Sequence, residues 1–178
     1  IAAGKVTYSN VTPTTTYIAT LYNNEAKRGQ LQFTTPAAMP SANYKYTLPS
    51  DVNVISQTLI EEIAEQAKAA AGNETNYSAT IGIPAGATVS LYGTNDSDGG
   101  KTNVTIPDGM SVTFFGLAGG DAPTINLDKN FDVAGSHAFI KFQNVKLEEN
   151  GAGYFINQSK ACTISEFTLE DCEVSNIK

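Results

Sequence analysis

Two stretches in the middle of the chain carry the same order of apolar and polar positions. Residues 81–89 read IGIPAGATV and residues 104–112 read VTIPDGMSV, so the order aliphatic-x-Ile-Pro-x-Gly-x-x-Val returns after 23 residues. Proline interrupts a strand and glycine permits a turn, so each stretch predicts a strand, a turn and a second strand. Recurrence at roughly 20–30 residues predicts that the strands form a coil rather than a compact sheet.

Three later segments repeat a strand pattern at a longer spacing. Ile140–Leu147 aligns with Phe167–Val174 at a step of 27 residues, and Val112–Leu117 aligns with the first of them at a step of 28. Each segment contains one residue that tolerates left-handed backbone angles, namely Gly116, Asn144 or Asp171. Alternation predicts that one set of side chains points inward, with Ile140, Phe142, Val145 and Leu147 above Phe167, Leu169, Cys172 and Val174. On the outer face it places Lys146 above Glu173, an exposed ion pair that would stabilise the fold little.

The first third of the chain predicts a strand unit, a linker and a helix. Apolar and polar residues alternate, as in half-buried strands, over Lys5–Ser9, Thr16–Tyr22 and Gln30–Thr35. Turn residues between the last two predict a hairpin. Residues 36–50 contain three prolines and predict a semi-rigid linker.

From Ser56 the period becomes helical. One face of the predicted helix is apolar and consists of Leu59, Ile60, Ile63, Ala64, Ala67 and Ala71. Ser56 is expected to cap its start, and Gly72 to end it. A helix directly before stacked strands is expected to cover the open end of the stack.

Composition narrows the function classes. Charged residues make up 16% of the 178 residues, and hydrophobic residues 41%, which fits a folded chain. A net charge of −7, with Arg28 as the only arginine, disfavours nucleic acid and anionic membrane surfaces as partners. No apolar run reaches the roughly 18 residues of a membrane span. The two cysteines, Cys162 and Cys172, either pair or pack singly as small core residues.

The chain as a whole resembles secreted Bacteroidetes proteins (Bacteroides type) of unknown function, in which a fibronectin type III module precedes a pectate-lyase-like right-handed parallel β-helix. The resemblance rests on VTPTTTY at residues 11–17, which is similar to the Leu-x-Pro-x-Thr-x-Tyr corner of those modules, and on FTTP at 33–36. It also rests on the predicted helix and on the segments IPDGMSVTFFGLAGG and IKFQNVKLEENG.

This resemblance implies a mostly β, pectin-lyase-like fold in three regions. Residues 1–36 would be the C-terminal part of a fibronectin type III-like domain, and 37–55 a proline-containing linker. Residues 56–178 would form one N-terminal capping helix and the first turns of the parallel β-helix. Roughly three to four turns are expected, without a closing cap, so we expect an N-terminal fragment of a longer protein.

The resemblance further implies a non-catalytic fragment of a secreted or cell-surface protein that binds or handles polysaccharide. Two alternatives are the N-terminal scaffold of a polysaccharide lyase or hydrolase whose active site lies beyond residue 178, and an architectural spacer. The expected location is secreted, periplasmic or at the cell surface, with a lipid anchor on a removed N-terminus as one option. Expected partners are a polysaccharide and a second copy, which would pair through the uncapped strand end near Val174 and Ile177.

A pectate-lyase-like enzyme would need a calcium site of stacked acids and a basic residue that abstracts a proton. No arginine accompanies the late acids, so they are expected to form a solvated face: Glu148, Glu149, Glu170, Asp171 and Glu173. TNDSDGG at 94–100 resembles a calcium loop, but it lacks an acid at the first position and has Thr105 at the twelfth, so we expect a polar turn. No catalytic, metal or cofactor-binding residue is assigned, and calcium is the one cofactor considered.

Three other features carry weaker chemical signals. His137 has no cysteine or second histidine near it, so a turn or surface role is expected rather than metal binding. The glycine-rich segment 116–120 precedes no predicted helix and indicates a tight corner between strands, not a phosphate site. N-x-S/T sequences begin at Asn10, Asn103 and Asn157, and they imply no glycosylation in a bacterial protein.

Overall fold

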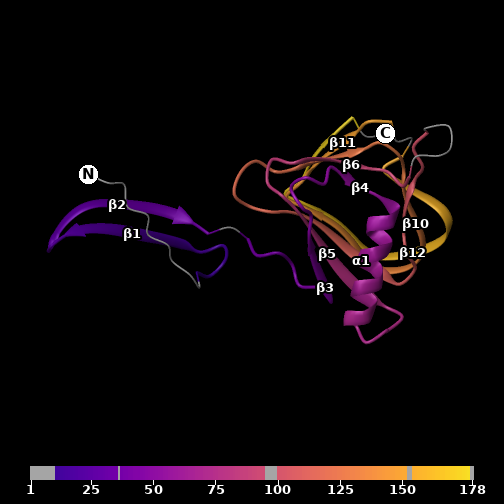
Figure 1. Cartoon of the computed structure of the whole chain (residues 1–178), viewed down its shortest axis with the longest axis horizontal. Coiled ribbons are helices and arrows are strands. Elements are labelled where there is room, and N and C mark those ends of the chain that lie inside the picture. Colours follow the sequence, from indigo (N-terminus) through magenta and orange to yellow (C-terminus); the bar gives the residue numbers. More distant parts are fainter. Residues whose placement is uncertain (1–10, 36, 95–99, 152–153, 177–178) are drawn as a thin grey trace. The chain divides into compact units, whose positions relative to one another are not determined.

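The computed structural model describes residues 11–35, 37–94, 100–151 and 154–176. The chain divides between Ala38 and Met39 into two compact units (Figure 1). The first unit contains β1 (Thr16–Asn23) and β2 (Ala26–Thr34). The second contains β3 (Tyr44–Thr47), β4 (Val54–Ile55), α1 (Gln57–Ala70), β5 (Tyr77–Ile83), β6 (Thr88–Leu91), β7 (Val104–Ile106), β8 (Met110–Gly116), β9 (Thr124–Leu127), β10 (Phe131–Gln143), β11 (Lys146–Glu149), β12 (Ile156–Glu170) and β13 (Glu173–Ser175).

The first unit is the predicted hairpin. Strands β1 and β2 pair antiparallel, and Tyr17 stacks on Phe33 with ring centroids 6.0 Å apart. The Tyr17 hydroxyl accepts a hydrogen bond of 2.8 Å from the backbone N–H of Thr12, which is the corner that the sequence predicts. The strand predicted at Lys5–Ser9 lies outside the described residues.

The second unit is built from parallel strands. One sheet has six strands, with β3, β5, β8, β10 and β12 side by side in that order, and with β7 paired to the first part of β10. The other sheet has five, in the order β4, β6, β9, β11 and β13. The chain passes from the first sheet to the second and back several times, so each strand lies beside the strand of the next passage (Figure 1). Within the described residues, the expected mostly β fold with one helix is confirmed.

The longer repeat corresponds to the pairing register. Ile140 lies opposite both Val112 and Phe167, and Leu147 lies opposite Val174, as the steps of 27 and 28 residues predict. Lys146 also lies opposite Glu173, with the ammonium and carboxylate 4.0 Å apart. The shared register confirms that these segments are stacked copies of one strand pattern.

The two copies of the shorter repeat do not lie opposite each other in the stack. The prediction that their 23-residue spacing is the step of a coil of strands was therefore wrong. Ile81 in the first copy lies opposite Phe114, whereas Val104 in the second copy lies opposite Phe131. The first copy therefore forms the corner from β5 to β6, and the second forms the corner from β7 to β8.

The two copies nevertheless build the same local turn. The carbonyl of Pro84 accepts a hydrogen bond from the N–H three residues later, at 3.1 Å, and that of Pro107 does the same at 3.1 Å. The glycine within each turn has positive φ, 70° at Gly86 and 81° at Gly109, which a side chain would disfavour. The 23-residue repeat is therefore explained by the same type of turn, which occurs at two different corners.

The predicted linker at 37–55 is only partly irregular, because it contains two strands. β3 pairs with β5, and β4 pairs with β6, so each belongs to one of the two parallel sheets. Pro40 and Pro49 lie just outside β3, where a missing N–H costs no ladder hydrogen bond. The linker was predicted from the prolines of this segment. Tyr44 and Tyr46, however, alternate with polar residues as in a strand.

The predicted left-handed positions are correct at two of three sites. Asn144 and Asp171 have φ of 53° and 51°. Gly116 has no positive φ, so that prediction was wrong there. It is glycine for another reason, because an added Cβ would lie 1.9 Å from the carbonyl oxygen of Asn144. The Asn144 amide donates a hydrogen bond of 2.8 Å to the Gly116 carbonyl and joins these two levels of the stack.

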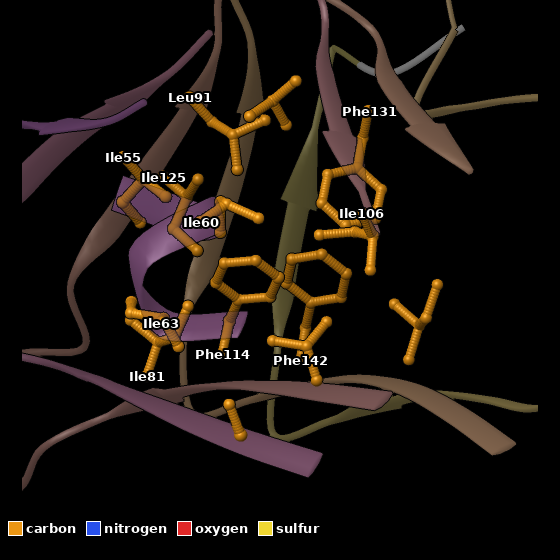
Figure 2. Packing of buried hydrophobic residues seen from close by; sticks show 14 of the residues in the cluster. Ile55, Ile60, Ile63, Ile81, Leu91, Ile106, Phe114, Ile125, Phe131 and Phe142 are labelled. Carbon is orange, nitrogen blue, oxygen red and sulfur yellow. The ribbon is translucent and has the colours of Figure 1, made fainter. Parts of the chain in front are cut away.

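Aligned inward side chains form the core. The rings of Phe114 and Phe142, on neighbouring strands, stack with centroids 4.9 Å apart, and Phe131 meets both at steep angles (Figure 2). Ile60 and Ile63 enter the same core from α1 (Figure 2). The inward residues predicted in β10, in β11 and at the corner between them are all 0% exposed: Ile140, Phe142, Val145 and Leu147.

The helix α1 forms as predicted. The Ser56 hydroxyl accepts a hydrogen bond of 3.2 Å from the N–H of Leu59, which caps the start. Gly72, just after the end, has φ of 74°. The buried residues of the helix come from the predicted apolar face: Ile60, Ile63, Ala64 and Ala67.

One helix side chain takes the place of a neighbouring strand. The amide of Gln57 accepts a hydrogen bond of 2.7 Å from the N–H of Thr105 in β7 and donates one of 3.2 Å to the Thr105 carbonyl. These are the two contacts that a paired strand would make to that residue. Because α1 also contacts β3 and β5, it covers strands at the start of the stack, as expected.

We predict that Gln57→Ala lowers the free energy of unfolding by about 1–3 kcal/mol, because both backbone groups of Thr105 lose their partner. Urea unfolding followed by circular dichroism measures this change. Gln66→Ala is the matched control, since Gln66 is an exposed residue of the same helix, and its effect should stay within about 0.5 kcal/mol. Equal effects of the two substitutions would show that the Gln57 contacts do not stabilise the stack.

The last strands of the stack expose residues that are buried at the corresponding positions of earlier strands. Phe167, Leu169 and Val174 are 41%, 42% and 46% exposed, although their partners Ile140, Phe142 and Leu147 are fully buried. Ile177 lies outside the described residues. Apolar side chains beside the unpaired backbone of an edge strand favour association.

Association of two copies through this end stays a prediction. We expect the average mass from light scattering to rise with protein concentration, and Leu169→Asn to reduce that rise. Thr163→Asn, at another exposed position of β12, should leave it unchanged. A strictly monomeric protein at high concentration would contradict the prediction.

Candidate functional site

A groove between α1 and β3 is the best candidate for a binding site. It has a volume of about 320 Å³ and is lined by Tyr44, Tyr46, Leu59, Glu62, Ile63, Glu65 and Gln66. The two tyrosines point to the same side of β3 because they are two residues apart. Both are half-buried and pack against the core, so their rings have a fixed apolar support.

The helix supplies the other wall through residues at helical spacing. Glu62 and Ile63 follow Leu59 by three and four residues, and Gln66 follows them by four and three, so the four residues form one stripe on α1. Leu59 and Ile63 contribute apolar surface near the strand, whereas the side chains of Glu62 and Gln66 are exposed. The groove therefore has an aromatic and aliphatic floor with a polar rim.

The polar groups of this groove are not used by the fold. Within the described part of the chain, the Tyr44 and Tyr46 hydroxyls and the Glu62, Glu65 and Gln66 side chains have no hydrogen-bond partner in the protein. Glu61 directly precedes Glu62 but does not line the groove, and it accepts a hydrogen bond of 2.8 Å from Gln57. The rim thus offers donors and acceptors to a ligand without breaking internal contacts.

A second hollow lies on another side of α1. Its volume is about 300 Å³, and it is lined by Glu61, Ala64, Glu65, Lys68, Tyr77 and Pro107. Tyr77 is almost fully buried, and burial, aided by the charge of Asp108, raises the pKa of its hydroxyl. With one largely buried ring and no second aromatic residue, this hollow is a poorer binding surface than the groove.

The late acids that the sequence singles out are not brought together. Glu148 lies on β11 and Glu173 on β13, opposite Ser175 and Lys146. Glu170 is on β12 in the other sheet, where it accepts a hydrogen bond from Gln143, and Asp171 occupies the corner. Glu149 accepts a hydrogen bond from the N–H two residues later. The described residues contain no group of three or more His, Cys, Asp or Glu that is arranged to hold a metal ion.

The loop that resembles a calcium site lies mainly at residues 95–99, outside the described residues. At its margins Thr94 and Thr102 pair, with the Thr102 N–H donating a hydrogen bond of 2.8 Å to the Thr94 carbonyl. The twelfth position, Thr105, is bound through its backbone to Gln57.

His137 is buried within β10, so the turn or surface role expected for it was wrong. It is 2% exposed, and its ring nitrogens lie 2.6 Å from the Met110 carbonyl oxygen and 2.9 Å from that of Ala134. Both ring nitrogens are therefore occupied by the backbone. Sequence reasoning missed this because the strand predicted here begins at Ile140, whereas β10 begins at Phe131.

The glycine-rich segment and the cysteines have structural roles. Residues 117–123, which include most of the glycine-rich segment, connect β8 to β9 without a helix, as predicted. Cys162 and Cys172 are free and pack against the core. Burial raises the pKa of the Cys172 thiol, and the charges of Asp171 and Glu170 add to this, which makes it a poor nucleophile.

Two of the asparagines noted as N-x-S/T sites support a buried acid that the sequence analysis missed. Asn103 donates to one carboxylate oxygen of Asp132 at 3.1 Å, and Asn157 donates to the other at 2.7 Å. Asp132 is 7% exposed, so these amides supply hydrogen-bond partners to a buried carboxyl group on β10. Asn10 lies outside the described residues. Because the three side chains come from different levels of the stack, only the register could reveal the cluster.

Asp128 forms the other buried acidic centre. It is 4% exposed, forms an ion pair with Lys101 and accepts a hydrogen bond of 2.6 Å from Asn150. Burial is the largest single influence and raises the pKa of Asp128, but hydrogen bonds from Lys101, Asn150 and Ser90 together outweigh it and lower the pKa. The Lys101 ammonium also lies 4.6 Å from the centre of the Tyr92 ring.

Comparison with protein-family models, curated proteins and solved structures found no match to this chain. In the described residues, no helix has the length and apolar character to cross a membrane.

We predict that Asp128→Asn lowers the free energy of unfolding at pH 7 by about 1–3 kcal/mol, because the amide has no negative charge to pair with the Lys101 ammonium. Since the pKa of Asp128 is lower in the folded protein, its stabilising effect is present above the ordinary aspartate pKa of about 3.9 and is lost as pH falls through the folded value.

The difference between wild type and this variant should therefore shrink below about pH 4 in urea unfolding. Asp121→Asn, at an exposed aspartate, should change the free energy of unfolding by no more than about 0.5 kcal/mol. A difference that grows towards low pH would contradict the assignment.

Proposed function

We propose that this chain is a non-catalytic, glycan-binding part of a secreted or cell-surface protein. The observation that carries the proposal is the α1–β3 groove, in which two tyrosine rings lie beside unpartnered carboxylate, amide and hydroxyl groups. Aromatic rings pack against the apolar C–H faces of sugars, and the polar rim exchanges hydrogen bonds with sugar hydroxyls.

The proposal includes the finer fold expected from the sequence. The parallel strand order, the recurring register and the helix at the start support a right-handed, pectin-lyase-like parallel β-helix. The hairpin with the Tyr17–Thr12 hydrogen bond supports a partial fibronectin type III-like segment. Both features are typical of modules that present binding surfaces outside the cell.

A catalytic role within the described residues is less well supported than binding. Glu148, Glu170 and Glu173 are distributed over two sheets, and both ring nitrogens of His137 contact backbone carbonyls. Acid–base chemistry needs such groups together at one substrate position. A lyase or hydrolase site beyond residue 178 is the second candidate, which cleavage assays distinguish from binding.

The first test is isothermal calorimetry of the chain against a polysaccharide panel, combined with assays for reducing ends and unsaturated products with and without calcium. We expect binding to at least one glycan and no cleavage. Tyr46→Ala and Gln66→Ala should each weaken binding about tenfold or more, since each removes a group that contacts the ligand.

Tyr22→Ala is the matched control, because Tyr22 is an exposed tyrosine of the hairpin unit. Circular dichroism should show a folded protein for all three variants, and the exposed position of Gln66 protects the test if Tyr46→Ala is unstable. Absence of binding at millimolar glycan, or cleavage by this chain, would overturn the proposal.

A further inference from the structure

We infer that the α1–β3 groove rejects uronic-acid polymers in favour of glycans that carry no carboxylate. This inference rests on the glycan-binding function proposed above and adds the chemical class of the ligand. It is argued from the sign of the charges around the groove and from the position of the nearest cations.

Both ionisable groups on the groove rim other than the tyrosines are carboxylates. Glu62 and Glu65 are exposed and lie within one helical turn of each other, and neither has a cation as a partner within the described residues. A uronate placed on the tyrosine floor would bring a third carboxylate close to these two. Like charges in such a site disfavour binding without any steric clash.

Neither of the two nearby lysines lines the groove. Lys45 alternates with Tyr44 and Tyr46 along β3, so it points to the opposite side of the strand. Its ammonium donates a hydrogen bond of 2.9 Å to the Met39 carbonyl there. Lys68 lines the second hollow and does not line the groove. A carboxylated sugar would therefore find no counter-charge in the groove.

An uncharged sugar meets each of these groups favourably. The carboxylates of Glu62 and Glu65 accept hydrogen bonds from sugar hydroxyls, and the Gln66 amide both donates and accepts. Hydrogen bonds between a hydroxyl and an ionised carboxylate are stronger than those between neutral groups. The volume of about 320 Å³ is at the low end for small-molecule sites, so the groove takes a short stretch of a glycan.

The test uses matched pairs of polymers, each a uronan and the same uronan with its carboxylates reduced to alcohols. In calorimetry at low ionic strength we expect the reduced forms to bind at least about tenfold more tightly than the uronans. Added salt should reduce this difference in affinity, because it screens the repulsion between carboxylates. Glu62→Gln should reduce the difference in affinity as well. Glu148→Gln, which changes the net charge equally at an exposed position on β11, should leave it unchanged.

The outcomes separate this inference from the proposed function. A uronan that binds as tightly as its reduced form, with binding lost in Tyr46→Ala, would overturn the charge selection and leave glycan binding at the groove intact. A preference for reduced polymers that Glu62→Gln and Glu148→Gln alter equally would also overturn it. Binding of no glycan at all would overturn both proposals.

Discussion

The second unit depends on covering the inward side chains and the strand edges at each level of the parallel stack. Between neighbouring levels this cover comes from the next strand, as where Phe114 stacks on Phe142. Among the described strands, β7 pairs with β10 alone, so no strand covers its other edge. The side chain of Gln57 makes the missing backbone contacts to Thr105, and α1 supplies apolar side chains to the core. At the far end Phe167 is partly exposed.

The same constraint explains why a groove forms where it does. Tyr44 and Tyr46 are opposite Ala79 and Ile81, so they begin two columns of inward side chains. Because α1 covers only part of the rings, the groove remains between helix and strand. Tyrosine suits this position, since its ring packs on the core while its hydroxyl reaches solvent. The candidate site is thus a consequence of how the stack begins.

Buried polar groups show how a repetitive stack accommodates charge. Asp132 and Asp128 each receive side-chain hydrogen bonds from residues far away in sequence, such as Asn157 and Asn150. In parallel strands the same position recurs at each level, so a single asparagine can donate a hydrogen bond to a carboxylate one level away. These contacts engage both carboxylates, so neither Asp128 nor Asp132 is free for chemistry.

The sequence by itself determined the local elements. The period of apolar residues and the Ser56 cap defined α1, and the 27-residue step defined the pairing of Ile140 with Phe167, because both signals depend on side-chain periodicity alone. It could not assign the 23-residue repeat to a level of the stack, since identical turns suit several corners. It also missed β3 and the groove. Tyr44 and Glu62 become neighbours only when the strand joins the sheet and the helix packs across it, so long-range packing alone decided the site.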